Sequence, residues 1–453
     1  DQSWTREMGN DTEPFVFVDE KISTVARKVI QQQTTDGAFF VCDVRDLEHK
    51  VDLWRQELPG ITPFYAVKCS TDPVVLHTLS SRGVNFDCSN MSEIKMVLDI
   101  GVSPDRIVYA NTIKSSSHLD FASEHGVTLM TFDCMEELGK ISDKNARLLL
   151  RIASNETGSG ITMNNKFGCR LEEAGNLLQI ARYMGFNVVG IAFHVGAAYR
   201  CPDIFARSIA EARSVFNVGI RIGHPMTVLD IGGGFTGGLR SHDRLLKLCE
   251  TIRLAVDEYF PASSGVRVIA EPGQFFVTSA YTLATRVVAE RRKDIDVNGE
   301  ILNHKDIFIN ESLCNCINRD LFRFMDIGIR PLNPPHERPC NVLSTVWGAT
   351  CNPLDCILDK QPLFEVCVNE WLLMDNMGAY TLVGASGFNG FGFPPVHYVA
   401  STASATAVRQ VLKSMNVRSG YGHMEQLVKP RRTQSHHHLR RFSATPDMFV
   451  CAE

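Results

Sequence analysis

The feature that most constrains the fold is a repeat of short apolar runs, each followed by a stretch with helical spacing. Eight such runs lie between residues 64 and 271, and most are separated by about 20 to 40 residues, enough for one helix and two loops. Near-continuous apolar runs are typical of parallel strands buried on both faces. The pattern predicts a parallel (β/α)8 barrel. The runs are Phe64–Val67, Val84–Asp87, Ile107–Ala110, Thr128–Phe132, Leu148–Ile152, Val188–His194, Thr227–Ile231 and Val266–Glu271.

Polar or charged residues stand at the ends of these runs. In a barrel of this kind the C-terminal ends of the strands surround the active site. Helix capping explains an aspartate or asparagine at such a position, but it does not explain a lysine, an arginine, a histidine, three glycines and a glutamate together. We therefore expect the chemistry at this end of the barrel. The residues are Lys68, Asp87, Asn111, Asp133, Arg151, His194, Gly232 to Gly234 and Glu271.

Lys68 is the most informative of these residues, because a lysine is rarely buried without a partner. It follows the apolar run Phe64–Val67. In a partly desolvated pocket a lysine amine loses its proton more easily and can form a Schiff base with an aldehyde. Alternatively, the side chain reaches out of the strand end to solvent.

Three further strand ends fit the same chemistry. The triplet that begins at Gly232 can direct backbone N–H groups at a phosphate, although it also fits a tight turn. Glu271 can hold a protonated ring nitrogen, and His194 is either a core histidine or a ring that faces an aromatic cofactor. Together with Lys68, these groups predict bound pyridoxal 5'-phosphate (PLP).

Composition excludes several other functions. The chain has 453 residues, 44% hydrophobic and 21% charged, with a net charge of −5, so no general attraction to nucleic acid or to an anionic membrane is expected. No apolar run reaches the length of a membrane span. The 14 cysteines lack the spacing of a disulfide framework or a zinc site, and the N-terminus lacks the apolar core of a signal peptide. We expect a cytoplasmic protein with reduced thiols and no metal.

The pattern changes after Glu271, where strand-like runs with Gly and Pro punctuation predict a β-rich domain, closed or sandwich-like. Strands near residues 15–42 are expected to join it. The last residues form a helix end and a basic, disordered tail, in which the His436 to His438 run is low-complexity sequence or, less simply, a metal ligand set. The predicted parts are an N-terminal segment 1–42, a barrel 43–274, a β-rich domain 275–410 and a tail 411–453. The strand-like runs of the predicted β-rich domain are Phe275–Val277, Leu283–Glu290, Ile307–Ile309, Val342–Trp347, Glu370–Asp375 and His397–Val399.

Several motifs, in order over roughly residues 35 to 400, resemble the eukaryotic ornithine decarboxylase family, whose barrel is that of alanine racemase-like PLP enzymes. The resemblance implies a homodimer with shared active sites and a role in amine or polyamine biosynthesis. The motifs are Pro63–Cys69, Phe86–Cys88, Lys166–Gly168, Phe193–Gly196, Leu229–Phe235, Ala270–Gly273, Trp347–Cys351 and Asp375–Thr381.

The resemblance also implies a role for each site residue. Lys68 would carry PLP with Asp87 beside it, and Cys351 of the partner subunit would protonate the carbon that loses CO2. Other residues would hold the cofactor: His194 stacks on the ring, Glu271 pairs with its nitrogen, Arg151 supports the ring region, and Gly233, Gly234 and Tyr380 hold the phosphate.

The sequence departs from the family pattern at the phosphate and at the substrate. Where the family has a serine and an arginine on the phosphate, this chain has Ala197 and Gln274. Two acidic residues that hold the distal amine of ornithine align with Arg323 and Asn352, and a pocket tyrosine aligns with Cys314. Removing the acidic groups removes the attraction for a diamine, which favours a neutral or acidic amino acid as substrate. Phe388 is also expected in this pocket.

The same departures fit a second class of protein. Antizyme inhibitors share this fold, bind antizyme and have lost the cofactor site, so a non-catalytic regulator is the alternative. The antizyme-facing surface of the family uses several lysines, and two of those positions here are Met91 and Asp120, whereas Glu137 and Lys140 match. Antizyme is therefore a candidate partner.

Overall fold

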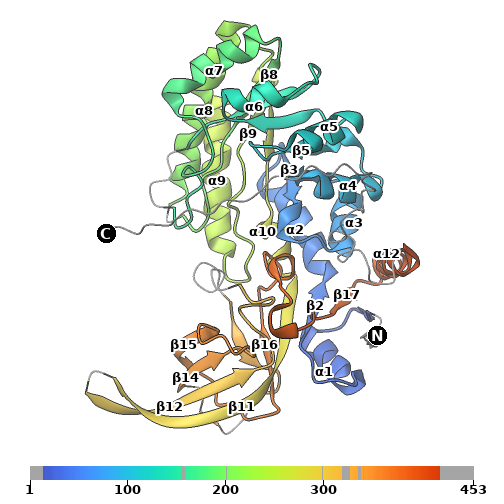
Figure 1. The fold of residues 1–453 in the computed structure, drawn as a ribbon, viewed down its shortest axis with the longest axis vertical. Helices are drawn as coiled ribbons and strands as arrows, with labels where there is room; N and C mark the ends of the chain where they lie inside the picture. The colour runs from blue at the N-terminus through green and yellow to red at the C-terminus, as the bar shows by residue number, and fades with distance from the viewer. Residues whose placement is uncertain are drawn as a thin grey trace, which may run out of the picture. The chain divides into compact units, whose positions relative to one another are not determined.

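Eight parallel strands form a closed barrel, in the order β10-β3-β4-β5-β6-β7-β8-β9 (Figure 1). The computed structural model describes residues 14–154, 159–199, 201–297, 299–318, 327–334, 338–339 and 341–418. The predicted barrel is confirmed. Its strands are β3 (Ile61–Ala66), β4 (Asn85–Cys88), β5 (Ile107–Tyr109), β6 (Leu129–Phe132), β7 (Arg147–Arg151), β8 (Asn187–Ala192), β9 (Val228–Asp230) and β10 (Arg267–Ala270).

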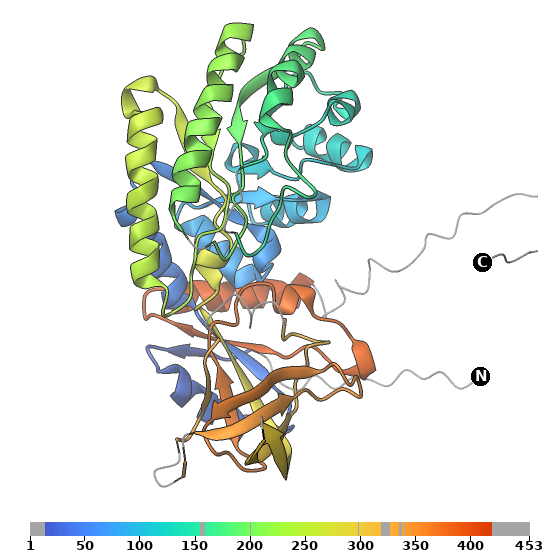
Figure 2. The ribbon, with the colours of Figure 1, turned by 90° about the vertical axis from the view of Figure 1, so that its left-hand side faces the viewer.

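Helices follow the strands and cover the outside of the barrel. Polar side chains cap several of them: Asp72 accepts from the N–H of Val74, and Asn90 accepts from that of Glu93. Figures 1 and 2 show α7, α8 and α9 side by side. The helices are α2 (Val44–Glu57), α3 (Pro73–Ser81), α4 (Met91–Asp99), α5 (Ser116–Glu124), α6 (Met135–Lys140), α7 (Leu171–Tyr183), α8 (Asp203–Ile222) and α9 (His242–Tyr259).

The barrel interior is filled by apolar side chains from its strands, so the barrel is a packed core and not a channel. Phe64, Val108, Leu149 and Ile269 belong to this cluster, and each is 0% exposed. Because the interior is filled, ligands have access only at the strand ends.

A second, nine-stranded sheet includes strands from both ends of the chain. Its main order is β1-β17-β2-β11-β12-β14-β15, while β16 pairs with β11 and β13. The long strand β11 is shared by two groups of strands, because its first part pairs with β2 and β16 and its later part pairs with β12. The strands are β1 (Val16–Val18), β2 (Phe39–Asp43), β11 (Tyr281–Val297), β12 (Glu300–Ile309), β13 (Ile329–Pro331), β14 (Val342–Trp347), β15 (Cys356–Leu363), β16 (Trp371–Met374) and β17 (Val396–Ala400).

Two elements differ from the sequence prediction. The expected strand Phe275–Val277 is wrong, because Gln274–Val277 forms a helical turn, α10, whose aromatic rings pack on Trp54 of α2. Helix α1 (Ile22–Gln32) was not predicted; it packs on the β-rich sheet with Val25 and Val29 buried. Helix α12 (Ala405–Arg418) ends the described part of the chain. The predicted basic tail and the His436 to His438 run lie beyond it.

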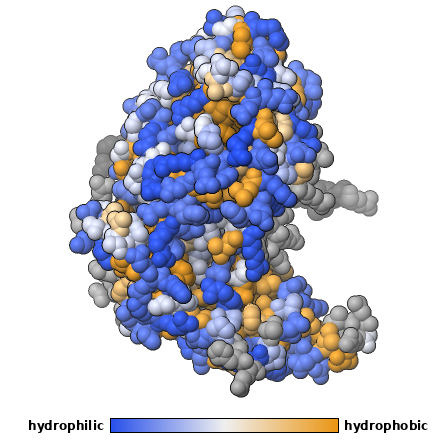
Figure 3. Space-filling model, turned by 180° about the vertical axis from the view of Figure 1, so that it is seen from behind, coloured by the Kyte–Doolittle hydropathy of each residue, from blue (hydrophilic) through white to orange (hydrophobic). Residues whose placement is uncertain are grey.

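The surface is mixed in character. On the face in Figure 3, hydrophobic side chains lie in separate groups within a largely hydrophilic surface. Among the described residues, no helix combines the length and the apolar character needed to cross a bilayer, and no cluster of three or more His, Cys, Asp or Glu could hold a metal ion.

Candidate active site

Lys68 lies in a short 3-10 turn, η1 (Val67–Cys69), immediately after β3. Its Nζ donates to Oδ2 of Asp87 at 2.5 Å, and Asp87 is the third residue of β4 and fully buried. The Lys68 side chain is 43% exposed. The lysine therefore does not reach away into solvent; it is held at the open end of the barrel by a buried carboxylate.

The pKa of the Lys68 amine is shifted in the direction opposite to the one that burial alone would give. Burial alone would lower its pKa, but the negative charges of Asp87 and Glu271 raise the pKa above its ordinary value. The prediction that desolvation eases loss of the proton is thus wrong for this arrangement, because the neighbouring carboxylates outweigh burial.

Three carboxylates meet near Lys68: Asp87, Asp230 at the end of β9, and Glu271 after β10. Oδ1 of Asp230 accepts from the N–H of Gly232 at 2.9 Å, and Asp230 is within hydrogen-bond reach of Glu271. Burial raises the pKa of Asp230 to about 7, while burial and the two aspartates raise the pKa of Glu271 well above its usual range. Near neutral pH the Asp230–Glu271 pair therefore holds a proton.

Asp230 was missed by sequence reasoning, although a signal was present. It is a carboxylate inside the apolar run Thr227–Ile231, where an unpaired acid is costly. Its Oδ2, like Oδ1 of Asp87, is buried and has no hydrogen-bond partner among the residues that the structure describes. Two buried acceptors without hydrogen-bond partners, at the C-terminal ends of β4 and β9, indicate space for a ligand that donates hydrogen bonds or carries positive charge.

His194 follows β8 and is held in one tautomer. Its Nδ1 accepts from the N–H of Gly196 at 3.0 Å, which leaves the proton on Nε2. Burial, with the charges of Arg151 and Lys68, lowers the pKa of His194 to about 3. The ring is therefore neutral, and it can stack on a flat ligand without adding charge. The Arg151 guanidinium also lies over the ring of Phe167, 5.1 Å from its centre.

The glycine triplet makes room at the same edge. A Cβ on Gly232 would lie 2.2 Å from the carbonyl oxygen of Phe193, and one on Gly233 would lie 2.9 Å from Nε2 of His194. Side chains are thus excluded, and the backbone approaches the site directly. Beyond the triplet, buried Lys50 donates to the carbonyl of Gly237 at 2.7 Å, which fixes the end of the loop.

Tyr380 reaches the lysine turn from the segment after β16. Its N–H donates to the carbonyl of Cys69 at 2.9 Å, and its hydroxyl is hydrogen-bonded to the Cys69 thiol. Its φ of 58° lies in the left-handed region, which is strained for a bulky residue and is frequent at functional sites.

Ala197 and Gln274 stand at the two positions where the sequence departs from the family pattern for the phosphate. Ala197 has no hydroxyl, and its backbone N–H and carbonyl pair with Ile161 at 3.1 and 3.0 Å. Gln274 begins α10 and is neutral.

Three loops of the β-rich part bring most of the predicted substrate residues together. Nδ2 of Asn352 donates to Sγ of Cys314 at 3.4 Å, and the exposed Cys351 is hydrogen-bonded to Asn389, next to Phe388. A cavity of about 440 Å³ beside them is lined in part by Cys351 and Asn352. Arg323 lies outside the described residues.

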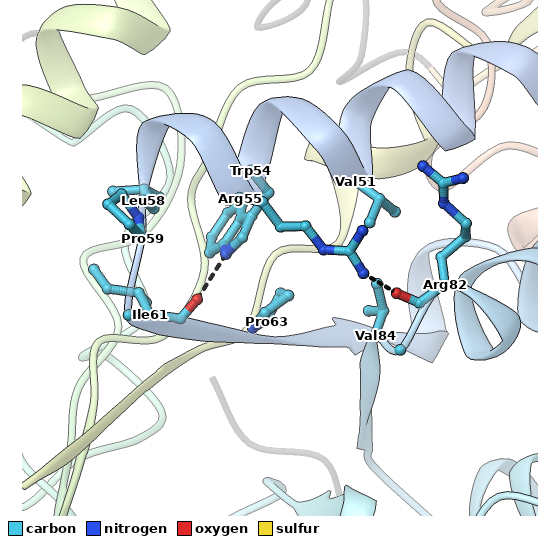
Figure 4. Close-up of a pocket in the computed structure, with 11 residues that line it drawn as sticks. Val51, Trp54, Arg55, Leu58, Pro59, Ile61, Pro63, Arg82 and Val84 are labelled. Atoms are coloured by element: carbon cyan, nitrogen blue, oxygen red, sulfur yellow. Dashed lines mark hydrogen bonds between the residues drawn. The ribbon is translucent and has the colours of Figure 1, made fainter.

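Another pocket lies away from these groups. Figure 4 shows it beneath α2, around the start of β3, where Nε1 of Trp54 donates to the carbonyl of Ile61 at 2.9 Å. Two of its lining residues, Arg55 and Arg82, are both paired with Asp52. It is at the opposite end of β3 from Lys68, so it is no part of the candidate active site.

The positions expected to face antizyme are of two kinds. Met91 is half-buried and Asp120 is exposed, whereas Glu137 is fully buried between Lys114 and Lys140, at 2.9 and 2.5 Å. An ion pair inside the barrel wall accounts for Glu137, so its match to the family is no sign of contact with a partner.

The residues at the open end of the barrel fit PLP. The lysine amine suits the aldehyde, the partly buried Glu271 suits the ring nitrogen, neutral His194 suits the ring face, and the glycine cradle suits the phosphate. The orphaned oxygens of Asp87 and Asp230 indicate that the site is completed by a ligand. Fold and site together define a PLP-dependent enzyme of the barrel-plus-sheet class.

Comparison with known proteins identifies the family. Residues 44–278 match the model of the pyridoxal-binding domain of pyridoxal-dependent decarboxylases. The chain is 36% identical to ornithine decarboxylase of Rattus norvegicus over 403 residues, 87% of this chain and 86% of the relative. It is 37% identical to antizyme inhibitor 2 of Xenopus laevis over 401 residues, 86% of this chain and 87% of the relative.

Solved structures agree with this assignment. The arginine decarboxylase of Paramecium bursaria Chlorella virus, bound to agmatine, is similar with a TM-score of 0.77 and 34% identity, over 83% of this chain and 100% of that chain. The chain belongs to the ornithine decarboxylase family of pyridoxal-dependent decarboxylases, in which both decarboxylases and an antizyme inhibitor are its relatives.

Proposed function

We propose that this protein is an amino-acid decarboxylase that uses PLP and acts on a neutral or acidic amino acid instead of ornithine. The observation that carries this proposal is the group of buried carboxylates around Lys68, two of which have an oxygen without a hydrogen-bond partner in the described part of the chain. Buried, unpaired carboxylate oxygens cost free energy of folding. A cofactor with a cationic ring nitrogen and a carbonyl that reacts with the amine offsets this cost.

In this proposal each residue has a defined task. Lys68 binds the cofactor covalently, Asp87 orients the lysine amine, and Glu271 holds the ring nitrogen protonated with the help of Asp230. His194 stacks on the cofactor ring, and the positive charge of Arg151 helps to keep the His194 imidazole neutral. When bound, PLP supplies an electron sink for the pair of electrons left by CO2.

The phosphate is held by fewer groups than in the family pattern. We assign this role to the backbone of Gly233 and Gly234 and to the hydroxyl of Tyr380. Because Ala197 and Gln274 add neither a hydroxyl nor a charge, we expect weaker cofactor binding than an arginine would give.

Cys351 is proposed to supply the final proton. Its thiol is exposed at the edge of the β-rich sheet, and in a homodimer it would enter the site of the partner. Transfer of the thiol proton to the carbon that lost CO2 would leave a thiolate, which regains a proton from water. We also propose a barrel over residues 43–274, a β-rich domain over residues 275–410 and a cytosolic location.

The substrate proposal depends on the uncharged pocket residues. Asn352 and Cys314 contact one another and neither can balance a distal ammonium group. Arg323, which stands at the position of an acidic pocket residue in the family pattern, would repel such a group and favour an acidic one. Incubation of the PLP-loaded protein with each amino acid, with CO2 release as the measurement, tests this. Release from ornithine or lysine in preference to all neutral and acidic amino acids would contradict it.

The second candidate function is that of a non-catalytic regulator similar to antizyme inhibitors. Ala197 and Gln274 favour it, because both remove contacts to the cofactor phosphate. A pull-down with antizyme tests this candidate, with Met91→Lys and Asp120→Lys as the variants expected to strengthen binding. Tight binding of wild type without any CO2 release would support the regulator over the enzyme.

A further inference from the structure

Asn389 makes two hydrogen bonds to one residue on another loop. Its Oδ1 accepts from the N–H of Cys351 at 3.2 Å and from the Cys351 thiol at 3.3 Å. The two residues are 38 positions apart in the chain, so this contact is made by the fold and not by local sequence. The amide oxygen thus fixes both the backbone and the sulfur of Cys351.

We propose that Asn389 is a positioning residue that aims the Cys351 thiol for proton transfer. The inference rests on the proposed function only for what the thiol does in turnover. The positioning itself is a property of the loop that carries Asn389, and it can be measured without substrate.

The backbone at Asn389 supports this assignment. Its φ of 58° lies in the left-handed region, which asparagine adopts more readily than most residues with a side chain. Glycine would relieve any strain there, but it would have no acceptor. Asparagine combines a tolerated left-handed backbone with a side-chain oxygen that reaches Cys351.

The same loop also contacts the pocket segment. Oγ of Ser386 donates to the carbonyl of Cys314 at 2.5 Å and accepts from the N–H of Phe388 at 3.3 Å. The loop 386–390 therefore bridges the segment of Cys314 and the segment of Cys351. A change in this loop would move the thiol relative to the substrate pocket.

The expected chemical consequence concerns where the proton goes. In turnover the S–H bond of Cys351 breaks and a C–H bond forms on the substrate carbon. A thiol that is no longer aimed would protonate that carbon more slowly, so a larger share of turnovers would end in an aldehyde instead of the amine.

Three variants separate the contributions at this position. Asn389→Gly keeps the left-handed backbone without strain and removes the acceptor. Asn389→Asp keeps an acceptor oxygen, and Asn389→Ala removes it in a backbone that disfavours alanine. The first measurement is the rate of alkylation of Cys351 by iodoacetamide in the full-length protein without substrate, with the exposed Cys367 as an internal reference.

We expect Asn389→Gly to raise the Cys351 alkylation rate about two- to tenfold relative to Cys367, because one thiol hydrogen bond is lost. Asn389→Asp should stay at or below the wild-type rate. A ratio unchanged in Asn389→Gly, with an unchanged melting temperature, would overturn the proposal.

The second measurement is the fraction of turnovers that end in aldehyde. It should rise in Asn389→Gly and Cys351→Ala and stay near wild type in Asn389→Asp. An unchanged fraction in Asn389→Gly beside a raised one in Cys351→Ala would also overturn the proposal. If alkylation shifts as expected but no variant or wild type releases CO2, the positioning role is supported and the proposed decarboxylase function fails.

Discussion

Three carboxylates and a lysine share the open end of the barrel, and the balance among their charges depends on pH. Oδ1 of Asp230 is satisfied by the N–H of Gly232, but its Oδ2 has no hydrogen-bond partner within the described residues. Burial, Asp230 and Asp87 raise the pKa of Glu271, and the positive charges of Lys68 and Arg151 lower it. The ionisation of this pair is therefore a property that single substitutions can change.

Asp230→Asn should alter how stability depends on pH. The folded-state pKa of Asp230 is raised by burial from 3.8 to about 7, so between these values the folded protein binds a proton that the unfolded chain releases. Its contribution to stability is present below pH 4 and is lost as pH rises to 7. In protein without added PLP, we expect the variant to melt higher than wild type at pH 8, with the gap closing near pH 4. A difference in melting temperature that does not change with pH would contradict a proton shared by Asp230 and Glu271.

A second residue-scale prediction concerns the phosphate. Gln274→Arg restores a guanidinium at the start of α10, and a charge-assisted hydrogen bond to phosphate is worth about 1.5–3 kcal/mol. The dissociation constant for PLP, measured by equilibrium dialysis, should fall roughly 10- to 100-fold. Gln274→Met is the matched control, since it has similar size and no charge. Equal affinity in the arginine and methionine variants would show that this position does not face the phosphate.

At the scale of elements, closure of the barrel depends on a close approach between β8 and β9. A Cβ on Gly190 of β8 would lie 1.9 Å from the carbonyl oxygen of Val228 in β9. No rotamer change can relieve this contact, because the backbone fixes the position of a Cβ and the oxygen belongs to the backbone of β9. The strands could accept a side chain here only by moving apart.

Gly190→Ala should therefore destabilise the protein by about 3 kcal/mol or more. Gly139→Ala, in the exposed part of α6 with nothing within 4 Å of the added Cβ, should raise stability by ~0.5–1 kcal/mol. Urea denaturation of both variants is the measurement. A similar free energy of unfolding for the two variants would contradict the close approach of β8 and β9 at Gly190.

The elements that could be predicted from sequence are those whose periodicity matches their burial. The barrel strands are buried on both faces and read as apolar runs in the sequence. The run Phe275–Val277 could not be told from a strand, because three buried residues have no distinguishable period. Its helical form is set by packing on Trp54, a contact far along the chain.

The candidate site shows the same limit. Lys68, Asp87 and His194 were found because each interrupts an apolar run at its end. The Asp230–Glu271 pair and the contact of Asn389 with Cys351 were missed, because both depend on segments that only the fold brings together. Sequence gives the residue types at strand ends, whereas hydrogen-bond partners across loops require the structure.

At the scale of the whole molecule, the proposal divides one active site between two subunits. Lys68 lies at the barrel mouth, while Cys351 lies exposed on the β-rich part. If each site uses Lys68 of one subunit and Cys351 of the other, neither residue is sufficient in its own chain.

Mixing of two inactive variants tests this division. Lys68→Ala and Cys351→Ala homodimers should each lose the ability to form the amine product, the first because it cannot bind the cofactor covalently and the second because its turnovers end in aldehyde. Random exchange of subunits should restore about one quarter of wild-type activity, since half of the dimers are mixed and each of these has one complete site. No recovery, despite mixed dimers demonstrated by two affinity tags, would contradict a shared site.

The most direct test of the central claim is covalent capture of the cofactor on Lys68. The protein would be saturated with PLP, dialysed, scanned for near-ultraviolet and visible absorption, reduced with borohydride and mapped by peptide mass spectrometry. The account predicts a Schiff-base absorption band and a pyridoxyl label on the peptide that contains Lys68, both absent in Lys68→Ala. No band and no label at saturating PLP would contradict it and would favour the non-catalytic regulator.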